Sequence, residues 1–100
     1  MNKILFRNDL FDKVLSGEKT ETRRTSYYGS KNAILIAQTE TGFKTCQIQI
    51  LSSKKENVYN ISEESVINEG FKNKKDFLDV WQEIYKIEVN CIAYYFKIVT

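Results

Sequence analysis

The sequence predicts one α+β domain over residues 1–100, a small, mostly antiparallel β-barrel with flanking helices. Stretches with helical apolar periodicity alternate with short segments of strand character, and the order is strand, helix, polar strand, hairpin, two helices and a last strand. The chain has no proline and only 4 glycines, so no low-complexity linker divides it. A hydrophobic content of 42% suits one modest core.

The first elements are a strand and a helix. Residues 4–6 form a short apolar run that we expect to be a strand. Asn8 is a good helix N-cap with Asp9 in the first turn, and apolar residues follow at helical spacing: Leu10, Phe11, Val14 and Leu15. Gly17 stands where a left-handed residue ends a helix.

Residues 19–24 predict a polar strand, because they are rich in threonine and lack helical apolar periodicity. Alternation places Thr20, Thr22 and Arg24 on one face. Lys19, Glu21 and Arg23 then share the other face. Since neither face is apolar, we expect this strand to be a sheet edge or to line a polar cavity, where ligand sites are usually built.

The middle of the chain predicts a hairpin. Residues 25–32 form a polar loop, and residues 33–38 are an apolar run suited to a buried strand. A turn at Gly42 leads into residues 43–51, whose alternation indicates a half-buried strand. Residues 52–60 are polar and are interpreted as a loop or a ragged strand.

Two helices and a final strand complete the chain. Ser62 caps a short helix that ends at Gly70 and holds Glu69 at a rigid turn. Asn73 begins a capping box for the next helix, which has the clearest amphipathic stripe in the chain: Phe77, Val80, Trp81, Ile84 and Tyr85. Residues 91–99 are dense in β-formers and predict a long last strand.

Composition narrows the function classes. A formal net charge of +2 is too small for bulk attraction to nucleic acid, so any such binding depends on local clustering. The absence of histidine removes the commonest metal ligand, and we expect no metal and no cofactor. Cys46 and Cys91 lie on strand-like segments and are predicted to be small buried hydrophobes.

No targeting or membrane segment is predicted. The amino terminus reaches Arg7 and Asp9 before an apolar segment of signal-peptide length forms. No apolar run approaches the roughly 18 to 20 residues that span a bilayer, so a cytoplasmic protein without a membrane partner is expected. The oligomeric state stays open between a monomer and a weak dimer.

Residues 17–24 concentrate more reactive and anion-binding groups than any other stretch. The string from Gly17 to Thr20 invites comparison with a nucleotide-binding P-loop. That motif needs an earlier glycine and an adjacent Gly-Lys pair, and both are missing. Nucleotide binding by the P-loop mechanism is therefore excluded.

Lys19, Thr22 and Glu69 form a candidate catalytic set. A threonine hydroxyl is a poor nucleophile until a base removes its proton, and a desolvated lysine can be that base. In the alternative interpretation, Lys19 pairs with Glu21 or Glu69 on a solvated edge and Thr22 only satisfies strand propensity. The residues alone favour this second interpretation.

Arg23, Arg24, Tyr27 and Tyr28, with Thr20 beside them, form a candidate nucleic-acid or nucleoside site. Arginines bind phosphates with two parallel hydrogen bonds, and tyrosine rings stack on unpaired bases. The same arginines are also compatible with an ordinary solvated edge.

The sequence resembles the small ASCH domains of the PUA-like superfamily. Their pattern Gly-x-Lys-Thr-x-Thr-x-Arg is matched by residues 17–24. Residues 69–71 read Glu-Gly-Phe, and a helix with Trp81 and Tyr85 and a strand containing residues 95–97 follow in the family's order. The resemblance covers essentially the whole chain. It implies a β-barrel with a cleft that binds RNA or a modified nucleoside.

The resemblance leaves enzymatic activity open. Acetylcytidine amidohydrolases of this family use a lysine, a threonine and a glutamate, which fall on Lys19, Thr22 and Glu69. Other members are described as ribonucleases or RNA-associated regulators, and an interaction module in a viral or host-defence setting is a third alternative. Glu21 and Arg23 stand where the amidohydrolases have aliphatic residues. Glu21 favours a charged Lys19 and Arg23 opposes it.

Overall fold

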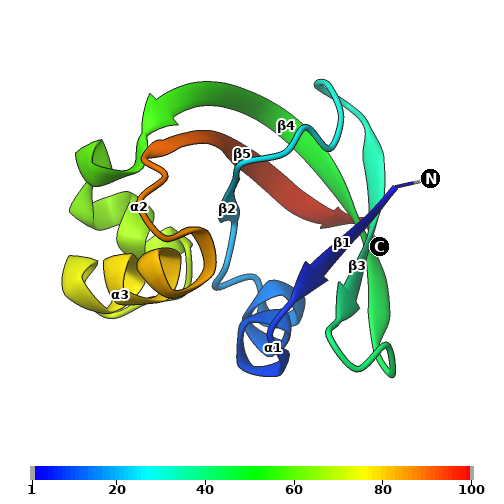
Figure 1. Cartoon of the computed structure of the whole chain (residues 1–100). Coiled ribbons are helices and arrows are strands. Elements are labelled where there is room, and N and C mark those ends of the chain that lie inside the picture. The colour runs from blue at the N-terminus through cyan, green and yellow to red at the C-terminus, as the bar shows by residue number, and fades with distance from the viewer. Residues whose placement is uncertain (1, 100) are drawn as a thin grey trace.

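The structure is a computed structural model that describes residues 2–99. Five strands and three α-helices follow one another along the chain (Figure 1). Their bounds are β1 Lys3–Phe6, α1 Asn8–Ser16, β2 Glu21–Arg24, β3 Ile34–Thr39, β4 Thr45–Asn57, α2 Glu63–Asn68, α3 Lys74–Tyr85 and β5 Asn90–Val99, with a 3-10 turn at Val58–Asn60 between β4 and α2.

The strands form one five-stranded sheet in the order β1-β3-β4-β5-β2. β1 and β3 are parallel, and every other neighbouring pair is antiparallel. The α+β class and the predominance of antiparallel pairing are therefore as predicted.

The predicted closure into a barrel is not confirmed, because β1 and β2 are the two edges of the sheet within residues 2–99. Backbone groups in β2 and just before it form hydrogen bonds outside the sheet: the Thr20 N–H donates to Asn68 O over 2.8 Å, and the Glu21 carbonyl accepts from Lys19 Nζ. One side chain spans the opening, since Arg24 Nη2 donates to Leu5 O over 2.7 Å.

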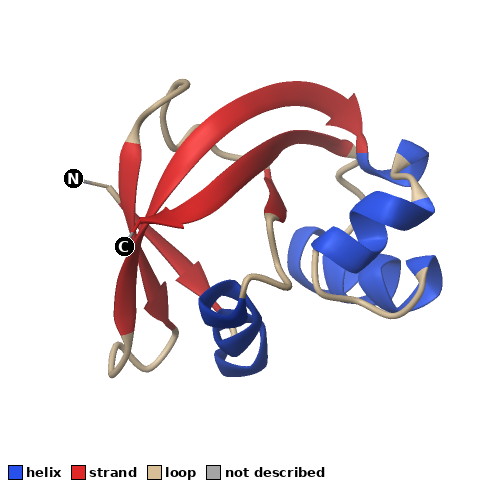
Figure 2. Cartoon of the chain, turned by 180° about the vertical axis from the view of Figure 1, so that it is seen from behind, coloured by secondary structure: helices blue, strands red, loops and turns tan. Residues whose placement is uncertain are grey.

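β4 and β5 form a long, curved pair that connects the two ends of the molecule (Figure 2). Their register shifts between Ile50 and Ser52. The segment interpreted as loop or ragged strand is strand as far as Asn57, because its backbone pairs with β5 although its side chains are polar. This extension places Glu56 near β2.

The helix boundaries confirm most of the predicted signals. Gly17 is left-handed with φ of 84°, and the side chains of Ser62 and Asn73 accept the expected capping hydrogen bonds. The predicted Asn8 cap is wrong, because α1 already includes Asn8 and its N-cap is Arg7. The Arg7 carbonyl accepts from the Phe11 N–H, so the helix begins one residue earlier than the side-chain pattern indicates.

The core is divided into two hydrophobic clusters. The first joins β1, β3 and parts of β4 and β5 to α1, and includes Phe6, Phe11 and Ile50. The second joins α2 and α3 to the region around Val58, and includes Trp81 and Cys91. In Figure 1, β2 lies between β1 and α1 on one side and α2 and α3 on the other. A polar strand therefore occupies the boundary between two apolar cores.

Two further sequence expectations concern the cysteines and membrane-spanning segments. Both cysteines are free thiols; Cys91 is buried as predicted, whereas Cys46 is only partly buried. No helix within residues 2–99 has both the length and the apolar character needed to cross a membrane.

Candidate functional site

Four charged side chains are buried at the boundary between the clusters. Lys19, Glu21, Arg23 and Glu69 are each 4% exposed or less. The left-handed turn at Gly17 redirects the chain after α1, and hydrogen bonds from the Lys19 and Thr20 backbones tie β2 to α1 and α2. Burying charged groups is expensive unless they are paired, so their partners decide what the site can do.

Lys19 has three oxygen acceptors. Its Nζ donates to the Glu69 carboxylate at 2.8 Å, to the Glu69 carbonyl at 2.7 Å and to the Glu21 carbonyl at 2.8 Å. Burial lowers the pKa of Lys19 below its ordinary value, and the Glu69 charge opposes this shift. The three acceptors match the three protons of an ammonium group.

Arg23 is surrounded by carboxylates. Nη1 lies 3.0 Å from oxygens of Glu21 and Glu69, and Nε donates to Glu56. Burial alone would lower the pKa of Arg23, but the charges of Glu69 and Glu56 raise it above its ordinary value. Asn68 donates to the other Glu21 oxygen over 2.8 Å. Within residues 2–99 no buried side-chain nitrogen or oxygen lacks a partner.

Arg24 points to the opposite face of β2 and has a different environment. Nη2 donates to Leu5 O over 2.7 Å, and Nε donates to Thr22 Oγ1 over 3.3 Å. The guanidinium carbon lies 5.0 Å from the ring centroid of Phe6 and 5.9 Å from that of Tyr28. No carboxylate within residues 2–99 forms a salt bridge with Arg24, so this cation is not neutralised by a direct partner.

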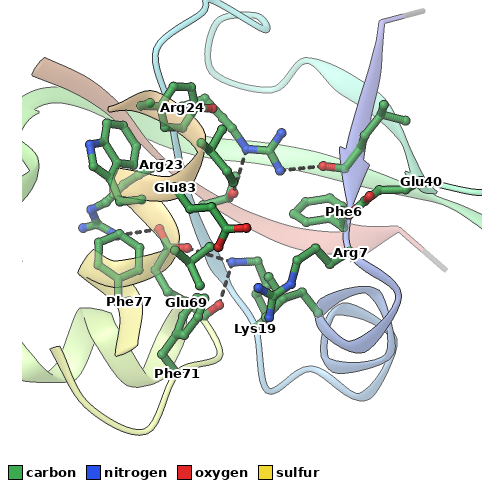
Figure 3. A pocket seen from close by; sticks show the side chains of 17 residues that line it. Phe6, Arg7, Lys19, Arg23, Arg24, Glu40, Glu69, Phe71, Phe77 and Glu83 are labelled. Carbon is green, nitrogen blue, oxygen red and sulfur yellow. Dashed lines mark hydrogen bonds and ion pairs between the residues drawn. The ribbon is translucent and has the colours of Figure 1, made fainter. Parts of the chain in front are cut away.

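A cavity of about 510 Å³ opens between the two clusters (Figure 3). Its size falls in the range of small-molecule sites. Polar groups and aromatic rings share its lining: Lys19, Thr22, Arg23, Arg24 and Glu69 with Phe6, Phe71, Phe77, Trp81 and Tyr85. Burial raises the pKa of Tyr85, and the charge of Arg24 opposes this shift.

The structure brings together the predicted catalytic set but links only two of its members directly. Lys19, Thr22 and Glu69 all line the cavity, and Lys19 is hydrogen-bonded to Glu69. Thr22 Oγ1 accepts from Arg24 and has no hydrogen bond with Lys19. Lys19 pairs with Glu69, as in the alternative interpretation, but the pair is buried and not on a solvated edge.

Three of the predicted binding residues, Tyr27, Tyr28 and Thr20, do not line the cavity. Tyr27 is 69% exposed and borders a different hollow, together with Lys55 and Asn90. Tyr28 is half-buried and packs edge-on against Tyr94, with ring centroids 6.0 Å apart. Thr20 is not part of the cavity lining. Among the predicted binding residues, only Arg23 and Arg24 line the cavity.

Sequence reasoning missed Glu56 and the aromatic lining. Glu56 and Arg23 pair with opposite edges of β5, opposite Cys91 and Ala93 respectively. Small residues at these alternating positions leave room for a salt bridge across β5, and they were the available signal. Phe6 was predicted only as part of an apolar strand and Phe71 only as part of the Glu-Gly-Phe segment, because nothing in the sequence places their segments side by side.

No protein-family model matches the sequence, and no curated protein matches it. Solved structures do match. An ASCH domain from Lactobacillus crispatus has a TM-score of 0.75 at 16% identity, covering 97% of this chain and 78% of that one. A protein from Enterococcus faecalis has a TM-score of 0.77 at 15% identity, covering 99% and 80%.

The ASCH protein from Zymomonas mobilis has a TM-score of 0.72 at 12% identity, covering 95% of this chain and 65% of that protein. Identities this low show the fold alone. The chain therefore has the fold of ASCH domains, which confirms the predicted resemblance at the level of the fold.

Proposed function

We propose that the cavity binds a single unstacked nucleobase, as a free nucleoside or as part of an RNA. The observation that carries this proposal is the position of Arg24, a cation without a carboxylate partner, at a cavity lined by aromatic rings. Unpaired bases are held by stacking on aromatic or guanidinium planes and by hydrogen bonds to their edges. The ASCH-type fold supports nucleic-acid or nucleoside binding in general.

Two groups supply the recognition. Arg24 stacks over Phe6 and retains donor nitrogens for a base carbonyl or ring nitrogen. The hydroxyl of Thr22 adds a group that both donates and accepts. Arg23 has a structural role in this proposal, because its Nε donates to Glu56 and its Nη1 lies 3.0 Å from oxygens of Glu21 and Glu69.

Isothermal titration calorimetry with cytidine, uridine, adenosine and guanosine, and with a short single-stranded RNA, tests the proposal. Arg24→Gln is expected to weaken binding by about 10-fold or more, because it removes a charged donor from the cavity. Tyr27→Ala is the control, since Tyr27 lies outside the cavity. The affinity of this variant for each ligand should match that of the wild type. No binding of any of these ligands at low salt would refute the proposal.

A second candidate is an amidohydrolase that deacylates an acetylcytidine-type nucleoside. Its supporting observation is that Lys19, Thr22 and Glu69 line one cavity. In this reaction Thr22 Oγ1 bonds to the amide carbonyl carbon while neutral Lys19 takes its proton. The C–N bond then breaks, the amine leaves with a proton delivered through Glu69, and water hydrolyses the acyl-threonine ester to acetate.

The hydrogen bonds favour binding over this reaction. Lys19 would have to lose a proton and turn from its three oxygen acceptors toward Thr22. Release of cytidine from acetylcytidine, followed by chromatography, measures the activity directly. If the reaction occurs, Thr22→Val abolishes it and Thr20→Val does not, because Thr20 lies outside the cavity lining.

A further inference from the structure

The mouth of the cavity carries carboxylates that have no direct cationic partner. Glu40 follows β3 and Glu83 belongs to α3, and both are exposed and line the cavity (Figure 3). Within residues 2–99 neither carboxylate forms a salt bridge. Lys86 donates to the backbone carbonyl of Glu83 over 3.1 Å, not to its carboxylate.

Arg7, a cation that lines the same cavity, is already paired. Arg7 binds Asp9, with Nη2 and Oδ2 2.9 Å apart. The hydrogen bond with Asp9 raises the pKa of Arg7, and the charges of Asp9, Glu40 and Glu83 add to the shift. One guanidinium therefore lies among three carboxylates, which leaves an excess of negative charge around the opening.

The charged groups behind the cavity, which are buried or half-buried, do not offset this excess. Cations and carboxylates are equal in number there: Lys19, Arg23 and Arg24 against Glu21, Glu56 and Glu69. In the binding mode that we propose, the base lies between the aromatic rings and the 5′ end of its ribose faces the opening. A phosphate at that end would meet Glu40 and Glu83 without net attraction from the interior.

We propose that Glu40 and Glu83 are specificity-determining residues that exclude phosphate, so that the cavity takes an uncharged nucleoside or base and not a nucleotide or an RNA strand. This inference rests on the proposed function. Placing like charges against a competing ligand is a common route to specificity. The repulsion acts through solvent, so it weakens as salt is added.

Calorimetric titrations of the whole chain with cytidine and with cytidine 5′-monophosphate test the inference. At about 20 mM salt, where the screening length exceeds 10 Å, we expect the monophosphate to bind about 5-fold more weakly than the nucleoside. At about 500 mM salt the difference should fall to within about 2-fold. This salt comparison uses only the wild-type protein.

The double variant Glu40→Gln and Glu83→Gln should bring the two dissociation constants to within about 2-fold at low salt, because the repulsive charges are gone. The matched control is Glu63→Gln with Glu64→Gln, which changes the net charge equally on exposed residues of α2 outside the cavity lining. Its ratio of dissociation constants should remain that of the wild type.

The outcomes separate this inference from the proposed function. If cytidine 5′-monophosphate or a short single-stranded RNA binds wild type as tightly as cytidine at low salt, the phosphate exclusion is wrong while base binding stands. An equal change of the ratio in the control variant also overturns it, because net charge and not the mouth would then be responsible. If no nucleoside, nucleotide or RNA binds, both proposals fail.

Discussion

Arg23 and Arg24 are neighbours in the chain but stand in opposite environments on the two faces of β2. Arg23 is 4% exposed, and its Nε and Nη1 bind three carboxylates, those of Glu21, Glu56 and Glu69. Arg24 is half-buried, donates to a backbone carbonyl and a hydroxyl, and lies over two aromatic rings. One arginine belongs to the fold, and the other is available to a ligand.

The difference shows that a basic pair in a sequence is not one basic surface when it lies on a strand. Successive side chains of a strand point to opposite faces, so each arginine has its own set of neighbours. A charge is most available to a ligand where the fold leaves it without a partner. Of the two arginines, Arg24 meets that condition.

Removing each arginine in turn tests the distinction with the largest expected effect. Arg23→Gln should lower the free energy of unfolding by about 3–5 kcal/mol, because it leaves buried carboxylates without their cation. Arg24→Gln should lower it by about 1 kcal/mol. Urea unfolding followed by the fluorescence of Trp81 measures both, and equal losses would remove the distinction.

A pair of glycines tests how the buried face is held in place. Gly70 has φ of +98°, and an added Cβ would lie 3.0 Å from Leu10 Cδ2, whereas Gly17 has φ of +84° and no atom within 4 Å of such a Cβ. We expect Gly17→Ala to cost about 1 kcal/mol and Gly70→Ala about 2–3 kcal/mol, the excess coming from steric overlap beside Glu69. Thermal and urea unfolding of both variants would show equal costs if this overlap were absent.

The pH dependence of stability probes the same face with a smaller effect. Burial raises the pKa of Cys91 from 9.0 to about 11, and the nearby charge of Glu56 adds to the shift. The folded state then holds a proton that the unfolded state releases, so this stabilisation is present below pH 9.0 and is lost as pH rises toward about 11.

Wild type should therefore lose about 1–2 kcal/mol more than Cys91→Ala between those pH values. Burial lowers the pKa of Lys19, which makes its contribution rise with pH, but this term is common to both proteins and cancels in the comparison. Urea unfolding at several pH values measures the difference. Parallel pH profiles would show that Cys91 is not shielded as described.

The sequence was most informative where a local rule decides the structure. The left-handed Gly17 and the caps at Ser62 and Asn73 follow from backbone and side-chain chemistry within a few residues. The polar strand at residues 19–24 was also recognisable, because two polar faces exclude a central apolar position. The structure limits the strand to Glu21–Arg24, with Lys19 and Thr20 just before it, and makes it both a sheet edge and part of a cavity lining.

What the sequence did not reveal depends on contacts between distant segments. The partner of Arg23 on β4, Glu56, lies 33 residues away and is brought near by the pairing of both strands with β5. At the open edge of the sheet, Lys19 Nζ donates to the Glu21 carbonyl and the Thr20 N–H donates to Asn68 O, and no local pattern encodes these contacts. The separation of Tyr27 from the cavity likewise depends on the path of a loop.

Arginine side-chain NMR distinguishes the two faces of β2 most directly. In protein labelled with ¹⁵N arginine, the Nε–H resonances of Arg23 and Arg24 are followed during titration with cytidine, and are assigned with Arg24→Gln. We predict a saturable shift of the Arg24 resonance and an unchanged Arg23 resonance. A saturable shift of Arg23 with Arg24 unaffected, or no shift of either, would contradict the assignment of structure to one face and ligand binding to the other.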